Sequence, residues 1–147
     1  MRNAVLVALM LVACAKSEQP AADTTAMTAG PAPLTEADVA GTWSGTMKPE
    51  GSDSVAVHWT QVCGTGSCRG TAQEMPDTVK STYTIAADSV VGKTEAYADP
   101  TMGGAKVVDN WVLRVTAPGQ IGGRGWYVLA DKPDSVVFRY TFEGARK

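Results

Sequence analysis

Two of the three cysteines lie close enough in the sequence to react with each other. Cys63 and Cys68 flank Gly64-Thr65-Gly66-Ser67, a glycine-rich stretch that can turn a β-hairpin. Facing residues in a hairpin have Cα atoms about 4.5–5.5 Å apart, a separation that a disulfide can bridge. A redox pair would favour a Cys-x-x-Cys spacing, and a metal site would need a second group of ligands. We therefore predict a structural disulfide between Cys63 and Cys68.

The remaining reactive side chains do not form a pattern typical of catalysis. His58 is the only histidine, so a metal site built from several histidines is excluded. A hydrolytic Ser-His-acid site would need a serine on a sharp turn, but the chain has no Gly-x-Ser-x-Gly motif. The glycine-dense segment 119–125 lacks the Lys-Ser/Thr of a phosphate-binding loop. We predict no catalytic residue, no metal and no cofactor, and we expect that the protein is not an enzyme.

The third cysteine, Cys14, follows a short apolar run. Arg2 supplies a positive charge near the start, and the ten residues from Ala4 to Ala13 are apolar. A run of this length is too short to span a bilayer as a helix, and with its cationic start it is typical of a secretory signal. The sequence Leu11-Val12-Ala13-Cys14 resembles the lipobox of bacterial lipoproteins.

This resemblance implies that residues 1–13 are a signal peptide, which is removed, and that Cys14 carries a diacylglycerol thioether and an acylated amino terminus. Each buried methylene contributes about 0.8 kcal/mol, so two or three acyl chains hold a protein on a membrane far better than one. The expected partner is a membrane, and the expected location is the cell envelope. Ala15 follows the cysteine in place of Asp, which points to the periplasmic face of the outer membrane if the organism is Gram-negative.

Composition divides the rest of the chain into a tether and one domain. Residues 14–35 are rich in Ala, Thr and Pro without an apolar period, so we predict the lipidated Cys14 followed by a flexible tether. Residues 36–147 are enough for one domain with a modest core. The net charge is -2, and acids and bases are interspersed. This excludes the basic patch that a nucleic-acid partner would require.

Alternation of apolar and polar residues predicts an all-β domain. In the clearest strand, Val55, Val57 and Trp59 would face one side and His58 the other. The predicted strands cover residues 41–47, 54–62, 68–74, 78–86, 89–97, 107–115, 120–130 and 136–142. A short helical turn is expected at 34–40. Short strands at nearly even spacing favour an antiparallel up-and-down barrel of about eight strands, and a β-sandwich is the alternative.

Two residues near the ends of this domain carry a second resemblance. Gly41-Thr42-Trp43 opens the first predicted strand, and Arg139 lies in the last. The pair is similar to the lipocalin and wider calycin pattern, in which an Arg from the last strand of an eight-stranded barrel packs over the Trp of an early Gly-x-Trp strand. The resemblance implies that Trp43 and Arg139 are structural, since a cation over an indole ring contributes about 0.5–2 kcal/mol.

We expect the barrel to bind a small apolar or amphipathic molecule. Trp59, Trp111 and Tyr140 would be wall residues, and Arg114 would be a polar contact near the rim. Eight strands leave an interior that side chains either fill or line around one small ligand. A filled interior would favour the alternative, a protein-interaction or inhibitor module that uses the loops at 63–68 and 99–104 to contact an envelope protein.

Overall fold

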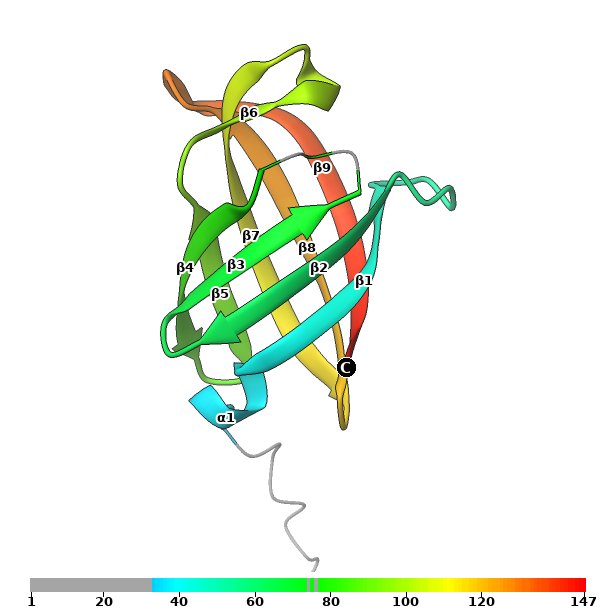
Figure 1. The fold of residues 1–147 in the computed structure, drawn as a ribbon, viewed down its shortest axis with the longest axis vertical. Helices are drawn as coiled ribbons and strands as arrows, with labels where there is room; N and C mark the ends of the chain where they lie inside the picture. Colours follow the sequence, from blue (N-terminus) through cyan, green and yellow to red (C-terminus); the bar gives the residue numbers. More distant parts are fainter. Residues whose placement is uncertain (1–32, 74, 76) are drawn as a thin grey trace, which may run out of the picture.

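The alternating segments form the strands of one antiparallel sheet (Figure 1). The computed structural model describes residues 33–73, 75 and 77–147. The predicted signal peptide, Cys14 and the tether up to residue 32 lie outside the described residues. The elements in chain order are α1 (Glu36–Val39), β1 (Gly41–Pro49), β2 (Val57–Gly64), β3 (Ser67–Ala72), β4 (Val79–Ala86), β5 (Ser89–Thr94), β6 (Tyr97–Asp99), the 3₁₀ turn η1 (Pro100–Met102), β7 (Ala105–Ala117), β8 (Gln120–Leu129) and β9 (Lys132–Arg146). In the part of the chain that is described, no helix is long and apolar enough to cross a membrane.

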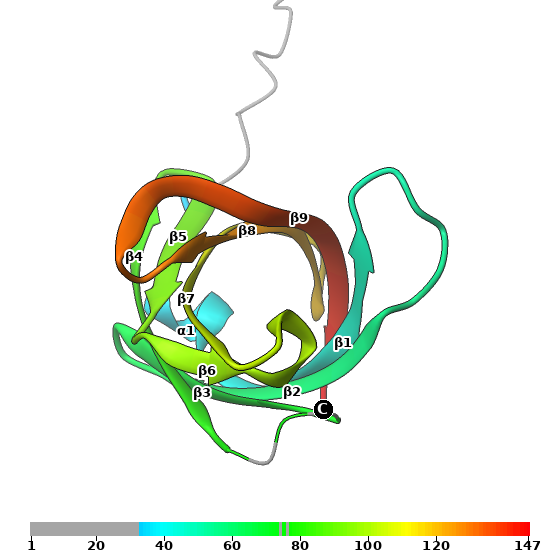
Figure 2. The same ribbon diagram turned by 90° about the horizontal axis from the view of Figure 1, so that it is seen from above.

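The sheet closes on itself through eight of these strands. Consecutive strands pair from β1 through β5 and again from β7 through β9. The ring closes because β9 also pairs with β1 and β5 pairs with β7. β6 is the extra strand and pairs with the start of β7. Figure 2 looks along the barrel axis and shows the closed ring with α1 at its far end. The predicted all-β, antiparallel up-and-down barrel is confirmed, and the β-sandwich is not the fold.

The bounds of most predicted strands shift by a few residues, and two of the differences have a clear structural cause. The predicted strand 54–62 begins three residues later, at Val57, and Val55 is exposed in the loop after β1. The predicted strand 89–97 is divided into β5 and β6. Lys93 pairs with Asn110 and Tyr97 pairs with Val107, so four steps along one strand match three along its partner. The extra residue prevents continuous pairing with β7, as in a β-bulge.

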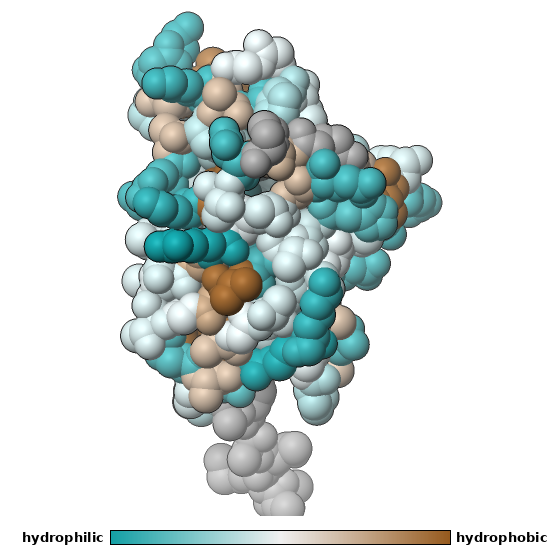
Figure 3. Space-filling view, in the orientation of Figure 1, coloured by the Kyte–Doolittle hydropathy of each residue, from teal (hydrophilic) through white to brown (hydrophobic). Residues whose placement is uncertain are grey.

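The outer surface of the barrel is mixed in character. Figure 3 shows one face on which apolar residues are scattered among polar ones. Among the described residues, the exposed large apolar side chains are all valines, namely Val55, Val62, Val91, Val136 and Val137. Val136 lies two residues before Phe138, which lines the cavity, so strict alternation would direct Val136 inward. A register shift between β8 and β9 near this residue breaks the alternation and leaves Val136 exposed.

Trp43 and an arginine of β9 close the end of the barrel where α1 lies. The Trp43 side chain is 2% exposed, and its Nε1 donates a hydrogen bond to the Val39 carbonyl at 2.8 Å. The guanidinium that covers the ring belongs to Arg146, whose Cζ lies 4.8 Å from the ring centroid. Arg146 Nη2 also donates to the carbonyls of Ala37 and Asp38, at 3.1 and 2.7 Å. This arginine therefore links α1, β1 and β9.

The prediction that Arg139 covers Trp43 was wrong. The antiparallel register of β1 and β9 pairs Trp43 with Arg146 and Pro49 with Tyr140. Arg139 thus lies near the other end of the barrel, exposed and opposite Trp126 of β8. The choice between the two arginines depended on this register, which no local pattern in the chain reveals.

The predicted disulfide between Cys63 and Cys68 is present. The two residues face each other directly in the register of β2 and β3, with their Cα atoms 4.0 Å apart. Both side chains are buried in the same core cluster as Trp43 and Val39. The disulfide therefore joins the β2–β3 hairpin at the packed end of the barrel.

Replacing Arg146 with Ala is expected to lower the free energy of unfolding by about 1–2 kcal/mol, because it removes the cation over Trp43 and two hydrogen bonds to α1. Arg139→Ala is the matched control, since this exposed arginine lies on the same strand, and its effect should stay within about 0.5 kcal/mol. Denaturant unfolding curves measure both changes. Equal losses in the two variants would contradict the assignment of Arg146.

Candidate functional site

A cavity of about 380 Å³ lies inside the barrel, toward the end opposite α1. The interior near α1 is instead filled by a core that includes Trp43, Tyr83, Val90, Leu113 and the disulfide. Small-molecule sites in proteins are typically about 300–1,000 Å³ and mostly apolar, with a few polar groups. The barrel is thus packed at one end and has a cavity of ligand size at the other.

Aromatic rings line this cavity, and glycines opposite them keep it open. A Cβ atom added at these glycines would lie within 3.0 Å of a ring atom, so each ring occupies the space next to a bare backbone. Glycine is therefore required for this close approach. With a larger residue at these positions, the rings would have to move away from the wall and project into the centre of the barrel. The glycine–aromatic pairs, matched by cross-strand register, are Gly45 with Trp59, Gly92 with Trp111, Gly125 with Tyr140, and Gly123 with Phe142.

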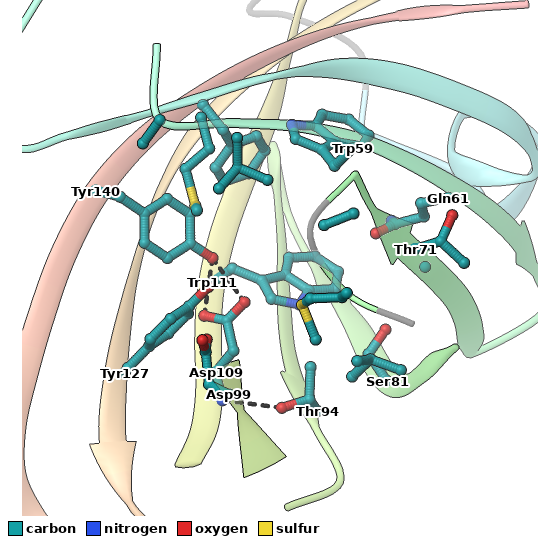
Figure 4. A pocket seen from close by; sticks show the side chains of 18 of the residues that line it. Trp59, Gln61, Thr71, Ser81, Thr94, Asp99, Asp109, Trp111, Tyr127 and Tyr140 are labelled. Carbon is teal, nitrogen blue, oxygen red and sulfur yellow. Dashed lines mark hydrogen bonds between the residues drawn. The ribbon is translucent and has the colours of Figure 1, made fainter. Parts of the chain in front are cut away.

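One carboxyl group stands among these rings. Asp109 is on β7 between Val107 and Trp111, and this alternation directs its side chain into the barrel. The Tyr140 hydroxyl lies 2.8 and 2.7 Å from the two carboxyl oxygens. Figure 4 shows the Asp109 carboxyl below this hydroxyl, with the rings of Trp111 and Tyr127 on either side. The Thr94 hydroxyl accepts a hydrogen bond from the backbone N–H of Asp109 at 2.8 Å.

The environment of Asp109 favours its neutral form. Burial raises the pKa of Asp109 to about 8, the Tyr140 hydrogen bond lowers it in part, and the nearby Asp99 carboxylate raises it. Burial also raises the pKa of Tyr97, Tyr127 and Tyr140, and the Asp109 charge adds to each increase. At neutral pH the carboxyl is therefore mostly protonated, and it accepts the hydrogen bond that the Tyr140 hydroxyl donates.

Asp99 is the second acid that lines the cavity. Its side chain is 2% exposed. Oδ1 accepts hydrogen bonds from the Thr101 backbone N–H at 2.7 Å and from the Thr101 hydroxyl at 2.6 Å. These contacts begin the η1 turn, as an Asp does at the first position of many helices and turns. Asp99 therefore has a local structural partner, whereas Asp109 is held mainly by Tyr140.

The structure places three of the four predicted ligand-binding residues together. Trp59, Trp111 and Tyr140 all line the cavity. Arg114 does not, and its expected position near the rim was wrong. It lies on the outer face, where Nε is 3.0 Å from the Ser89 hydroxyl and 3.6 Å from the Asp88 carboxylate. The cause is the alternation of side chains along β7, which directs Trp111 and Leu113 inward and therefore Arg114 outward.

The sequence interpretation missed Asp109, Asp99 and Tyr127 as cavity residues. Asp109 was visible in the alternating pattern of its strand, where a carboxyl occupies a position between the inward-facing Val107 and Trp111. An acid on the apolar face of a strand is the signal that could have identified it. Asp99 gave no such signal, since its burial depends on the packing of β6 and η1 over the barrel end.

Comparisons with known proteins add no assignment: no family model, curated protein or solved structure matches the chain at a significant level. The function must therefore be argued from the cavity and from the sequence.

Asp109→Asn is expected to make the protein more stable at alkaline pH. The pKa of Asp109 is higher in the folded state, about 8, than the ordinary value of about 3.9 in the unfolded chain. The folded state therefore keeps a proton that the unfolded chain releases, and stability falls as pH rises from about 4 to about 8, then levels. Asparagine does not titrate, so the variant avoids this fall in stability, and its amide retains a hydrogen-bonding group beside Tyr140.

Unfolding curves at about pH 5 and pH 8 test this expectation. The variant's advantage over the natural protein should grow by about 2–4 kcal/mol between these two conditions. The control is Asp53→Asn, which alters an exposed acid in the loop after β1. Parallel pH dependences for the natural protein and Asp109→Asn would show that Asp109 is not held neutral.

Proposed function

We propose that this protein is a lipid-anchored envelope protein whose barrel binds a small apolar or amphipathic molecule. The observation that carries this proposal is the cavity of about 380 Å³, lined by Trp59, Trp111, Tyr140 and other mainly apolar side chains. A closed barrel of eight strands has room for one small ligand when its side chains leave the interior open. The glycine–aromatic pairs provide that space here.

The cavity also favours binding over the alternative of an interaction module. That alternative needs a packed barrel that presents its loops, and the interior of this barrel is packed only near α1. Apolar residues do not form a continuous patch on the face shown in Figure 3. His58, the one histidine, is exposed and faces outward from β2, and we propose ligand binding without catalysis.

The proposed anchor is Cys14, on the strength of the lipobox Leu11-Val12-Ala13-Cys14. The described chain enters the barrel beside α1, at the packed end (Figure 1). A tether that continues from this point would leave the cavity at the end away from the membrane.

The contact of Arg146 with Trp43 supports the likeness to lipocalins, since a cation from the last strand covers the Trp of an early Gly-x-Trp strand.

Filling the cavity is expected to abolish binding of an apolar probe. Ser81 is 7% exposed and lines the cavity from β4, so Ser81→Phe would place a ring in the open space. The neutral dye N-phenyl-1-naphthylamine should bind the natural protein with a gain in fluorescence, and its affinity should fall at least about tenfold in this variant. Thr82→Phe is the matched control, because the adjacent Thr82 is exposed on the outer face.

Circular dichroism would confirm that both variants remain folded. The absence of dye binding to the natural protein would contradict the proposal. Equal dye binding by both phenylalanine variants would show that the dye does not occupy the cavity.

Cys14→Ser is expected to release the protein from membranes. In a bacterial host, the natural chain should fractionate with the membrane, and its intact mass should correspond to a protein that begins at Cys14 and carries acyl chains. Ser17→Ala, in the same segment, should leave fractionation unchanged. A natural chain recovered with an unmodified Cys14 would contradict the proposed anchor.

A further inference from the structure

We propose that the ligand of this cavity is an organic cation, an ammonium group on an apolar body, with its charge held against the Asp109 carboxylate and the surrounding aromatic rings. This inference rests on the proposed function of the barrel and specifies the class of ligand.

The first argument is the charge of the cavity. Its ionisable lining includes Asp99 and Asp109, and none of its described lining residues is Lys, Arg or His. Within the described chain, the only ion pair joins Arg114 to Asp88, on the outer face. Carboxylates inside proteins are normally paired with a cation. The charged form of Asp109 therefore lacks a counter-ion that the described residues supply, and a bound cation would provide it.

The second argument is the chemistry of the wall around Asp109. The Tyr140 ring centroid lies 5.6 Å from that of Tyr127 and 6.1 Å from that of Phe138, so the three rings form a continuous aromatic surface. Trp111 lies on the other side of the carboxyl (Figure 4). Aromatic faces attract cations, most strongly where water is excluded, and groups of such rings are used to bind quaternary ammonium ions. A carboxylate with aromatic neighbours suits an organic cation of this kind.

A metal ion fits these residues less well. The described residues contain no group of three or more His, Cys, Asp or Glu that could hold one. Asp99 Oδ1 already accepts two hydrogen bonds from Thr101. An ammonium ion with methyl or alkyl substituents needs no such set of oxygen or nitrogen ligands, because its charge is satisfied by one carboxylate and by the ring faces.

The protonation of Asp109 makes the binding of a cation depend on pH. The pKa of Asp109 is about 8, so only about one carboxyl in ten is ionised at pH 7. Because the cation binds the ionised form, its apparent affinity at pH 7 is about tenfold lower than at high pH. Affinity should rise about tenfold per pH unit below about pH 8 and then level, with a proton released on binding. The titratable groups that face Asp109 are Tyr97 and Asp99 from β6, Tyr127 from β8 and Tyr140 from β9.

An isosteric pair of ligands tests the inference directly. The neutral member is para-tert-butylbenzyl alcohol, and the cation is para-(hydroxymethyl)phenyltrimethylammonium, in which nitrogen replaces the quaternary carbon. Neither molecule titrates near neutral pH. Calorimetry with the full chain at about pH 8.5 should show at least about tenfold tighter binding of the cation. In Asp109→Asn this ratio should fall to about one, whereas the exposed-site control Asp53→Asn should preserve it.

The outcomes separate this inference from the proposed function. Equal or tighter binding of the neutral alcohol would overturn the cation inference and leave a small-molecule barrel in place. If neither isostere binds while N-phenyl-1-naphthylamine does, the cation inference is overturned and the cavity still takes apolar molecules. If the dye also fails to bind, both proposals fall. A preference for the cation that persists in Asp109→Asn would show that Asp109 is not the counter-ion.

Discussion

Closure of the sheet by the β1–β9 and β5–β7 pairings is the constraint on which the rest of the structure depends. A closed sheet leaves no long unpaired edge, and it sends alternate residues of every strand into one shared interior. The position of a residue along its strand then decides whether its side chain faces the interior or the outer surface. On β7 it directs Asp109 and Trp111 inward and Arg114 outward. A shift of one residue in this pairing would exchange these faces.

The two ends of the interior are built differently from similar residue types. Near α1, Trp43 is covered by Arg146 and packed beside the disulfide, so large side chains fill the space. Toward the other end, glycines stand opposite Trp59, Trp111 and Tyr140, and the rings lie against the wall. Aromatic content alone therefore does not determine whether a small barrel is filled, because the cross-strand neighbour of each ring decides how far it extends inward.

Asp109 is an interior residue that works against stability at alkaline pH. Removing a carboxyl group from water raises its pKa and favours the unfolded chain as pH increases toward 8. Such a group in an apolar interior is typical of a functional site, where a local loss of stability is compensated by packing elsewhere. Here the packed end, with Arg146, Trp43 and the disulfide, supplies that stability, while the other end keeps this polar group inside the cavity.

The sequence by itself determined the all-β class, the approximate strands and the Cys63–Cys68 disulfide. Each of these depends on local patterns, namely alternation of period two, turn residues and the hairpin between the two cysteines. Only the tertiary structure decided that Arg146 covers Trp43, that the interior has a cavity, and that Asp109 meets Tyr140 there. These features depend on the register between strands, which joins residues far apart in the chain through backbone hydrogen bonds that carry no signal in the local sequence.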